Sequence, residues 1–136
     1  MHINKNHEHW MSLALYQAKC AKENNEVPVG AVITIQDELV SSGFNQPIST
    51  HDPTAHAEII AIRAACSKIN NYRLTQATLY VTLEPCLMCY WAMMHARIKC
   101  CVFGATDQKV GVFSNQLIKG IYQNHTFSNI GGVLEE

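Results

Sequence analysis

The segment from residue 77 to residue 103 constrains the fold most, because it alternates between strand-type and helix-type apolar patterns. Ala77 to Leu83 reads ATLYVTL, a near-continuous apolar run typical of a strand that is buried on both faces. A proline is tolerated in a first helical turn, so Pro85 indicates a helix from about Cys86 to Ala96. A further buried strand is expected from Ile98 to Phe103. This order predicts a layered α/β domain with right-handed crossover helices between its middle strands.

The remaining elements are predicted from shorter patterns. Apolar residues at separations of three and four indicate an amphipathic helix near the N-terminus, and two β-branched runs indicate a hairpin. A loop with two prolines follows and ends at a second helix, for which Asp52 or Thr54 is the expected cap. The expected ranges are a helix over about 7–24, strands over 29–35 and 39–44, a loop over 45–54, a helix over about 55–68, a short helix near 116–119 and a strand near 126–130.

Length and composition indicate one globular domain over residues 1–136. Hydrophobic residues make up 48% of the chain and charged residues 15%, which is typical of a packed protein and not of a disordered one. No apolar run approaches the roughly 20 residues of a membrane span, and the polar N-terminal residues lack the apolar region of a secretory signal. We therefore expect a cytoplasmic protein with no membrane partner. The net charge of −1 gives no overall attraction to nucleic-acid phosphates, although a local basic surface remains compatible with it.

Two short motifs carry candidate chemistry, and each lies at the start of an expected helix. His56-Ala57-Glu58 begins one helix, and Pro85-Cys86-Leu87-Met88-Cys89 begins the next. In an open α/β sheet, the carboxyl ends of strands and the N-termini of helices meet at one edge, so the two motifs should lie together. Cys86 and Cys89 are three residues apart and share a helix face, and a helix start favours their thiolate form. His56 would supply a third ligand, leaving one tetrahedral position open, which is the arrangement of catalytic zinc.

Glu58 is expected to move protons and not to bind the metal. It lies two residues from His56, so on a regular helix the two side chains diverge by about 200°. A carboxylate close to the metal can take a proton from water and deliver it to a ring nitrogen and then to a leaving amine. An H-x-E motif followed by P-C-x-x-C is the known signature of zinc nucleobase deaminases, and the chain carries it in full.

Each half of this signature also has a simpler interpretation. Cys86 and Cys89 alone are compatible with a redox pair or a structural zinc site. Glu58 alone is compatible with a helix-start carboxylate that stabilises the helix by about 0.3–1 kcal/mol. Asn45, which precedes a Gln-Pro turn, is by itself more typical of a turn former than of a ligand contact.

Beyond these motifs, longer runs make the chain similar to the bacterial tRNA-specific adenosine deaminase family of the cytidine deaminase-like superfamily. The resemblance rests on EVPVGAV at 26–32, HDPTAHAEI at 51–59, YRLTQATLYVTLEPCLMC at 72–89, VFGATD at 102–107 and Asn124-His125. It implies a three-layer α/β/α sandwich with a mixed sheet of about five strands, one zinc ion per subunit and a homodimer. It also implies conversion of adenosine to inosine at the wobble position of a tRNA anticodon loop. The residues that match the family's base contacts are Asn45 and the backbone around Ala57.

Several departures from this family bear on the substrate more than on the chemistry. Tyr90 and Trp91 are bulky where the family usually has small residues, and the loop over 110–116 lacks an expected Gly-Ser pair. Thr126 replaces a usual basic residue, and the sequence stops at Glu136, where family members generally continue into a C-terminal helix that helps hold the RNA. Three alternatives therefore stay open: a deaminase of free nucleobases or nucleosides such as guanine or cytosine, a non-catalytic zinc-bearing partner subunit, and a thiol-disulfide oxidoreductase.

Overall fold

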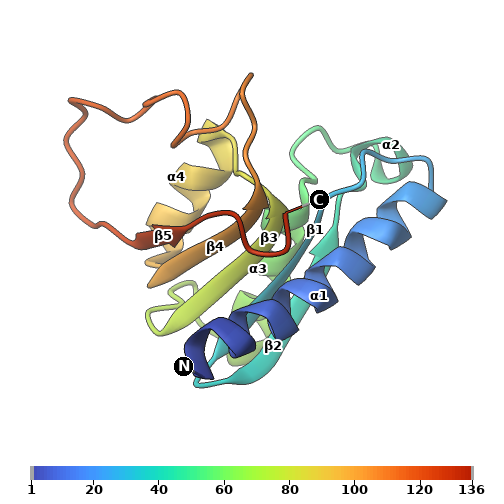
Figure 1. The fold of residues 1–136 in the computed structure, drawn as a ribbon, viewed down its shortest axis with the longest axis horizontal. Coiled ribbons are helices and arrows are strands. Elements are labelled where there is room, and N and C mark those ends of the chain that lie inside the picture. Colours follow the sequence, from blue (N-terminus) through green and yellow to red (C-terminus); the bar gives the residue numbers. More distant parts are fainter. Residues whose placement is uncertain (1, 136) are drawn as a thin grey trace.

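A computed structural model describes residues 2–135, with side chains described from His7 onward. Nine elements follow one another along this part of the chain (Figure 1). They are α1 (His2–Glu23), β1 (Gly30–Ile35), β2 (Glu38–Phe44), α2 (Pro47–Thr50), α3 (Ala57–Ile69), β3 (Ala77–Leu83), α4 (Leu87–Ala96), β4 (Cys100–Ala105) and β5 (Ser128–Ile130). None of the helices in this range has both the length and the apolar character that a membrane crossing needs.

The five strands form one mixed sheet in the order β2-β1-β3-β4-β5, which confirms the mixed sheet of about five strands that the family resemblance implies. β1 pairs antiparallel with β2 and with β3, whereas β3 pairs parallel with β4, and β4 pairs parallel with β5. Helix α3 connects β2 to β3, and α4 connects β3 to β4, so both middle connections are crossovers through a helix.

Helices cover both faces of the sheet and make three layers. α1 packs on one face, and α3 and α4 pack against each other on the opposite face (Figure 1). The strands serve both sides because alternate side chains point to opposite faces. Val32, Tyr80 and Val102 join the cluster under α1, whereas their neighbours in the same strands, such as Ile33 and Leu79, join the larger cluster under α3 and α4.

Gly43 on β2 allows α3 to approach the sheet closely. A Cβ atom at this position would lie 2.9 Å from the carbonyl oxygen of Ala57 and 2.9 Å from the amide nitrogen of Ala61. Both atoms belong to helix backbone, which cannot move aside as a flexible side chain can. The absence of a side chain at Gly43 therefore sets the distance between β2 and the first turn of α3.

Three details differ from the sequence-based expectations. The segment over 45–54 contains the one-turn helix α2 and is not entirely loop. Asp52 and Thr54 do not cap α3: Asp52 Oδ1 accepts hydrogen bonds from the amide and hydroxyl of Thr54, and His56 is the N-cap residue. The helix expected near 116–119 is wrong, because Gln116 has a left-handed φ of 53° and the chain forms turns there.

Candidate functional site

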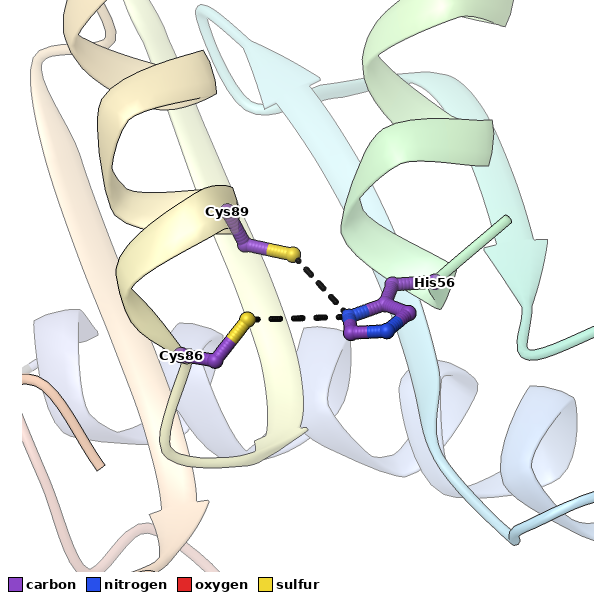
Figure 2. A group of neighbouring side chains, drawn as sticks. All are labelled: His56, Cys86 and Cys89. Carbon is purple, nitrogen blue, oxygen red and sulfur yellow. Dashed lines mark hydrogen bonds between the residues drawn. The ribbon is translucent and has the colours of Figure 1, made fainter. Parts of the chain in front are cut away.

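The two motifs meet where α3 and α4 begin. His56 is the N-cap residue of α3, Cys86 is the N-cap residue of α4, and Cys89 lies in the first turn of α4. His56 Nδ1 lies 3.4 Å from Cys89 Sγ and 3.7 Å from Cys86 Sγ, and the three donor atoms all lie within 4.8 Å of one another. Figure 2 shows the two sulfur atoms and the imidazole ring pointing toward a common centre.

Backbone conformation at the two caps leaves these side chains available. His56 has φ −71° and ψ 156°, and Cys86 has φ −81° and ψ 175°, so both are extended residues that precede a helix. In the described structure, neither side chain makes the capping hydrogen bond that Ser, Thr, Asp or Asn usually makes at this position. The sequence places donor atoms suited to a metal where other helices carry capping oxygens.

The donor set fits a zinc ion in both chemistry and spacing. One imidazole nitrogen and two sulfurs are typical zinc ligands, and zinc bond lengths with tetrahedral angles place nitrogen and sulfur about 3.5 Å apart. The two nitrogen–sulfur distances of 3.4 and 3.7 Å agree with this value. Among residues 7–135, whose side chains the structure describes, no fourth His, Cys, Asp or Glu completes the group. The site thus offers three protein donors to a metal ion, the number expected of a catalytic and not a structural centre.

The two thiols stabilise one negative charge between them. A hydrogen bond from Cys89, aided by backbone amides at the start of α4 and by His56, outweighs burial and lowers the pKa of Cys86 to about 5. The same hydrogen bond, together with burial, raises the pKa of Cys89 far above its ordinary value. The lowered pKa favours the thiolate form of Cys86 at neutral pH, which is the form that binds a metal cation.

Glu58 lies beside these donors in the first turn of α3, and its side chain is only 4% exposed. Burial raises its pKa to about 7, and the negative charge at Cys86 contributes in the same direction, although its own backbone amide, His56 and Cys89 oppose the rise. A carboxyl group with a pKa near neutrality can both accept and donate a proton under physiological conditions.

A cavity of about 110 Å³ opens beside Glu58 and the metal ligands. Asn45 lines it, and Asn45 Oδ1 accepts a 2.7 Å hydrogen bond from the amide of Ala57. The structure therefore brings the two predicted base-contact residues together, but as partners in one hydrogen bond with each other. The amide of Ala57 is already used, whereas Asn45 Nδ2 has no hydrogen-bond partner among the described residues. The cavity lining is completed by Val27, Val29, His56, Glu58, Leu83, Glu84, Cys86, Asp107 and Val110.

Sequence reasoning missed Glu84 at this site. The side chain is 2% exposed and accepts hydrogen bonds from Asp107, Phe113 and Ser114. Burial raises its pKa, but these hydrogen bonds together outweigh burial and lower it, so Glu84 is a carboxylate at neutral pH. The position of Glu84 at the end of an apolar strand, directly before Pro85, could have indicated its role, because a charged group that is buried there needs hydrogen-bond partners.

The bulky residues after Cys89 have a packing role. Tyr90 is 3% exposed, its ring contacts Trp91, Phe113 and Phe127, and its hydroxyl donates a hydrogen bond to Gln123. These contacts attach the segment that follows β4 to helix α4. Tyr90 is thus part of a cluster between the helix and this segment, and it does not line the cavity.

Comparison with known proteins agrees with this geometry. Residues 4–105 match the model of the cytidine and deoxycytidylate deaminase zinc-binding region. The chain is 47% identical over 133 residues to the tRNA-specific adenosine deaminase of Haemophilus influenzae, a match that covers 95% of this chain and 76% of that protein.

Solved structures show the same architecture. One from a study of A-to-I editing by tRNA:A34 deaminases at the wobble position of transfer RNA superposes with a TM-score of 0.89 at 41% identity, covering 93% of this chain and 94% of that chain. Guanine deaminase from Bacillus subtilis superposes with a TM-score of 0.75 at 31% identity, covering 90% and 82%. The two relatives share the fold but act on different purines.

Proposed function

The chain belongs to the tRNA-specific adenosine deaminase family and carries its zinc-binding region, and from this premise we propose its reaction, substrate and residue roles. The protein is a zinc-dependent hydrolytic deaminase that converts adenosine to inosine at the wobble position of a tRNA anticodon. In this reaction the oxygen of water replaces the amine at the purine C6, and ammonia leaves.

The observation that carries the proposal is the convergence of three metal donors beside a buried carboxyl group. His56, Cys86 and Cys89 would hold the zinc ion, and Glu58 lies in the first turn of α3, two residues after the cap residue His56. A bound zinc ion would act as a Lewis acid and bring the pKa of a water molecule close to neutrality. A redox pair would not need the His56 donor, a structural zinc site would need a fourth protein ligand, and neither would need a buried Glu58.

Glu58 is the proposed proton carrier. Burial raises its pKa to about 7, and this supports a group that exchanges a proton near neutral pH. It would remove a proton from the attacking water, protonate the purine ring, and later protonate the departing amine. Asn45 would donate a hydrogen bond from Nδ2 to the base, because Ala57 fixes its other amide atom. Ala57 thus contributes to base binding by orienting Asn45.

The proposed partners follow from the substrate. The tRNA anticodon loop would enter the cavity with the reacting adenosine turned out of its stack, since a deaminase cannot reach a stacked base. We also propose a homodimer and a cytoplasmic location, and a single domain over residues 1–136. Support for these assignments comes from the family to which the chain belongs.

A second candidate is deamination of a free purine, which the similarity to guanine deaminase favours. The net charge of −1 is also better matched to a small substrate than to a polyanion. A zinc-loaded sample should be assayed in parallel on an anticodon stem-loop with adenosine at the wobble position and on free adenine, guanine and cytosine. Inosine in the stem-loop, with little turnover of free bases, supports the tRNA activity. Turnover of a free base without inosine in RNA would overturn it.

A further inference from the structure

Glu84 lies between β3 and α4, two residues before the metal-site cysteine Cys86, and organises a segment far away in sequence. One carboxylate oxygen accepts hydrogen bonds from the Asp107 amide at 3.0 Å and the Ser114 hydroxyl at 2.5 Å. The other accepts bonds from the amides of Phe113 at 2.7 Å and Ser114 at 2.6 Å. Four donors from residues 107–114 thus surround one buried charge, and we call residues 107–114 the wall segment.

Gly111 shows how closely the wall segment is fitted around this carboxylate. A Cβ atom at Gly111 would lie 2.4 Å from Cδ and 2.4 Å from Oε1 of Glu84, which is too close for any side chain. Next to it, the amide of Val112 donates a 2.9 Å hydrogen bond to the carbonyl oxygen of Pro85. The wall segment is therefore attached to the strand–helix junction that carries Cys86.

The wall segment also forms part of the substrate cavity. Asp107 and Val110 line the same cavity as His56, Glu58 and Glu84. We propose that Glu84 is a positioning residue that holds the wall segment against the metal site and thereby sets the affinity for the RNA substrate. This inference rests on the proposed function. Glu84 acts through the wall segment and not on the reacting atoms, so its loss should weaken substrate binding more than it slows the chemical step.

The geometry makes Glu84→Gln the sharpest variant. Each oxygen of Glu84 accepts hydrogen bonds from two donors. The NH₂ group of a glutamine is itself a donor, so in either orientation it would face two donor groups and make no hydrogen bond with them. Ser114→Ala is a graded variant, because it removes the hydroxyl and leaves the three amide donors in place. Glu26→Gln is the matched control. Glu26 is also a buried glutamate, 6% exposed, that accepts bonds from the amides of Ile48 and Ser49, but its side chain does not line the cavity.

The experiment measures kcat and KM on the anticodon stem-loop, zinc content, and amide hydrogen exchange in the zinc-loaded wild type and the three variants. For Glu84→Gln we expect KM to rise about tenfold or more, kcat to stay within about twofold, zinc content to stay unchanged, and exchange to accelerate at residues 107–114. Ser114→Ala should raise KM less, by about twofold to threefold. Glu26→Gln should accelerate exchange near residues 48–49 and leave KM close to that of the wild type.

Two results would overturn the role of Glu84. One is unchanged exchange over residues 107–114 in Glu84→Gln, and the other is a fall in kcat with zinc loss at unchanged KM. If the Glu84→Gln protein does not fold, the Ser114→Ala variant provides the test. An unchanged KM together with unchanged hydrogen exchange in Ser114→Ala would contradict the proposal. Failure of the proposed function is distinguishable, because the wild type would then produce no inosine while the exchange comparison still reports on the wall segment.

Discussion

Asn45 Oδ1 accepts a 2.7 Å hydrogen bond from the amide of Ala57, the residue between His56 and Glu58. The loop that follows β2 is thereby joined to the first turn of α3 by a side chain that lines the cavity. The first amides of a helix have no hydrogen-bond partner inside the helix, and Asn45 Oδ1 supplies a partner for the amide of Ala57. One amide group thus stabilises the helix start through its oxygen and leaves its nitrogen available to a substrate.

Separating these two contributions is the purpose of an Asn45→Asp variant. An aspartate keeps an acceptor for Ala57 and is favoured at a helix N-terminus, but it has no donor for the base. We expect the melting temperature to stay close to that of the wild type while kcat/KM on the stem-loop falls about 10-fold to 100-fold. Asn45→Ala should lose both stability and activity. Unchanged kcat/KM in Asn45→Asp would exclude the Nδ2 contact.

Removal of the metal ligands should affect stability as well as chemistry. Replacing Cys86 or His56 by alanine leaves two of the three donors, and we expect zinc content measured by elemental analysis to fall to a small fraction of the wild-type value. A strong chelator should have the same effect on the wild type and should lower its melting temperature, because zinc binds the folded state. Cys101, which is buried but is not part of the donor group, offers a matched control. A Cys101→Ala protein should keep its zinc.

Gly43→Ala tests the close approach of α3 to the sheet. An added Cβ would lie 2.9 Å from backbone atoms of Ala57 and Ala61, so α3 must shift or the strand must bend. We expect a loss of about 1–3 kcal/mol in the free energy of unfolding, measured by urea titration, and reduced activity because His56 and Glu58 move with the helix. Ser42→Ala, a neighbouring change whose side chain points to the opposite face, should change stability little. Equal stability of the two variants would contradict the packing argument.

Glu26 should make stability depend on pH in the acid range. Burial raises its pKa, but hydrogen bonds from the Ser49 and Ile48 amides and the Ser49 hydroxyl outweigh burial and lower it. A folded-state pKa below the unfolded value means that the stabilisation is complete above about pH 4.5 and is lost as the pH falls through the folded-state pKa. The glutamine variant should be less stable than the wild type at neutral pH, and the difference should shrink in acid. If the difference in melting temperature between the wild type and Glu26→Gln were the same at every pH, this role of Glu26 would be contradicted.

The sequence predicts the sheet and the metal donors well for physical reasons. β3 and α4 carry strong local patterns, and the buried strands have almost no polar residues, so their type and order follow from short segments. His56, Cys86 and Cys89 can be expected together because both motifs begin helices at one edge of a sheet. The strand expected near 126–130 is present as the shorter β5.

What the sequence does not predict depends on long-range contacts. Glu84 binds residues more than 20 positions away, and no local pattern indicates which segment will supply its donors. The predicted cap of α3 is wrong because the Asp52 carboxylate accepts its hydrogen bond from the amide of Thr54, before α3 begins. His56 is then the N-cap residue. Tyr90 departs from the family pattern. Its large ring is explained by contacts with Phe113 and Phe127, which lie in the turn-rich segment after β4.

The most direct test of the account is the Glu58→Gln variant, assayed for both zinc and inosine. Glutamine preserves the size of a buried side chain that is not one of the three metal donors, but it cannot carry the proton. We predict wild-type zinc content and a loss of at least about 100-fold in the rate of inosine formation in the anticodon stem-loop. A zinc-loaded Glu58→Gln protein that forms inosine at the wild-type rate would contradict the central claim.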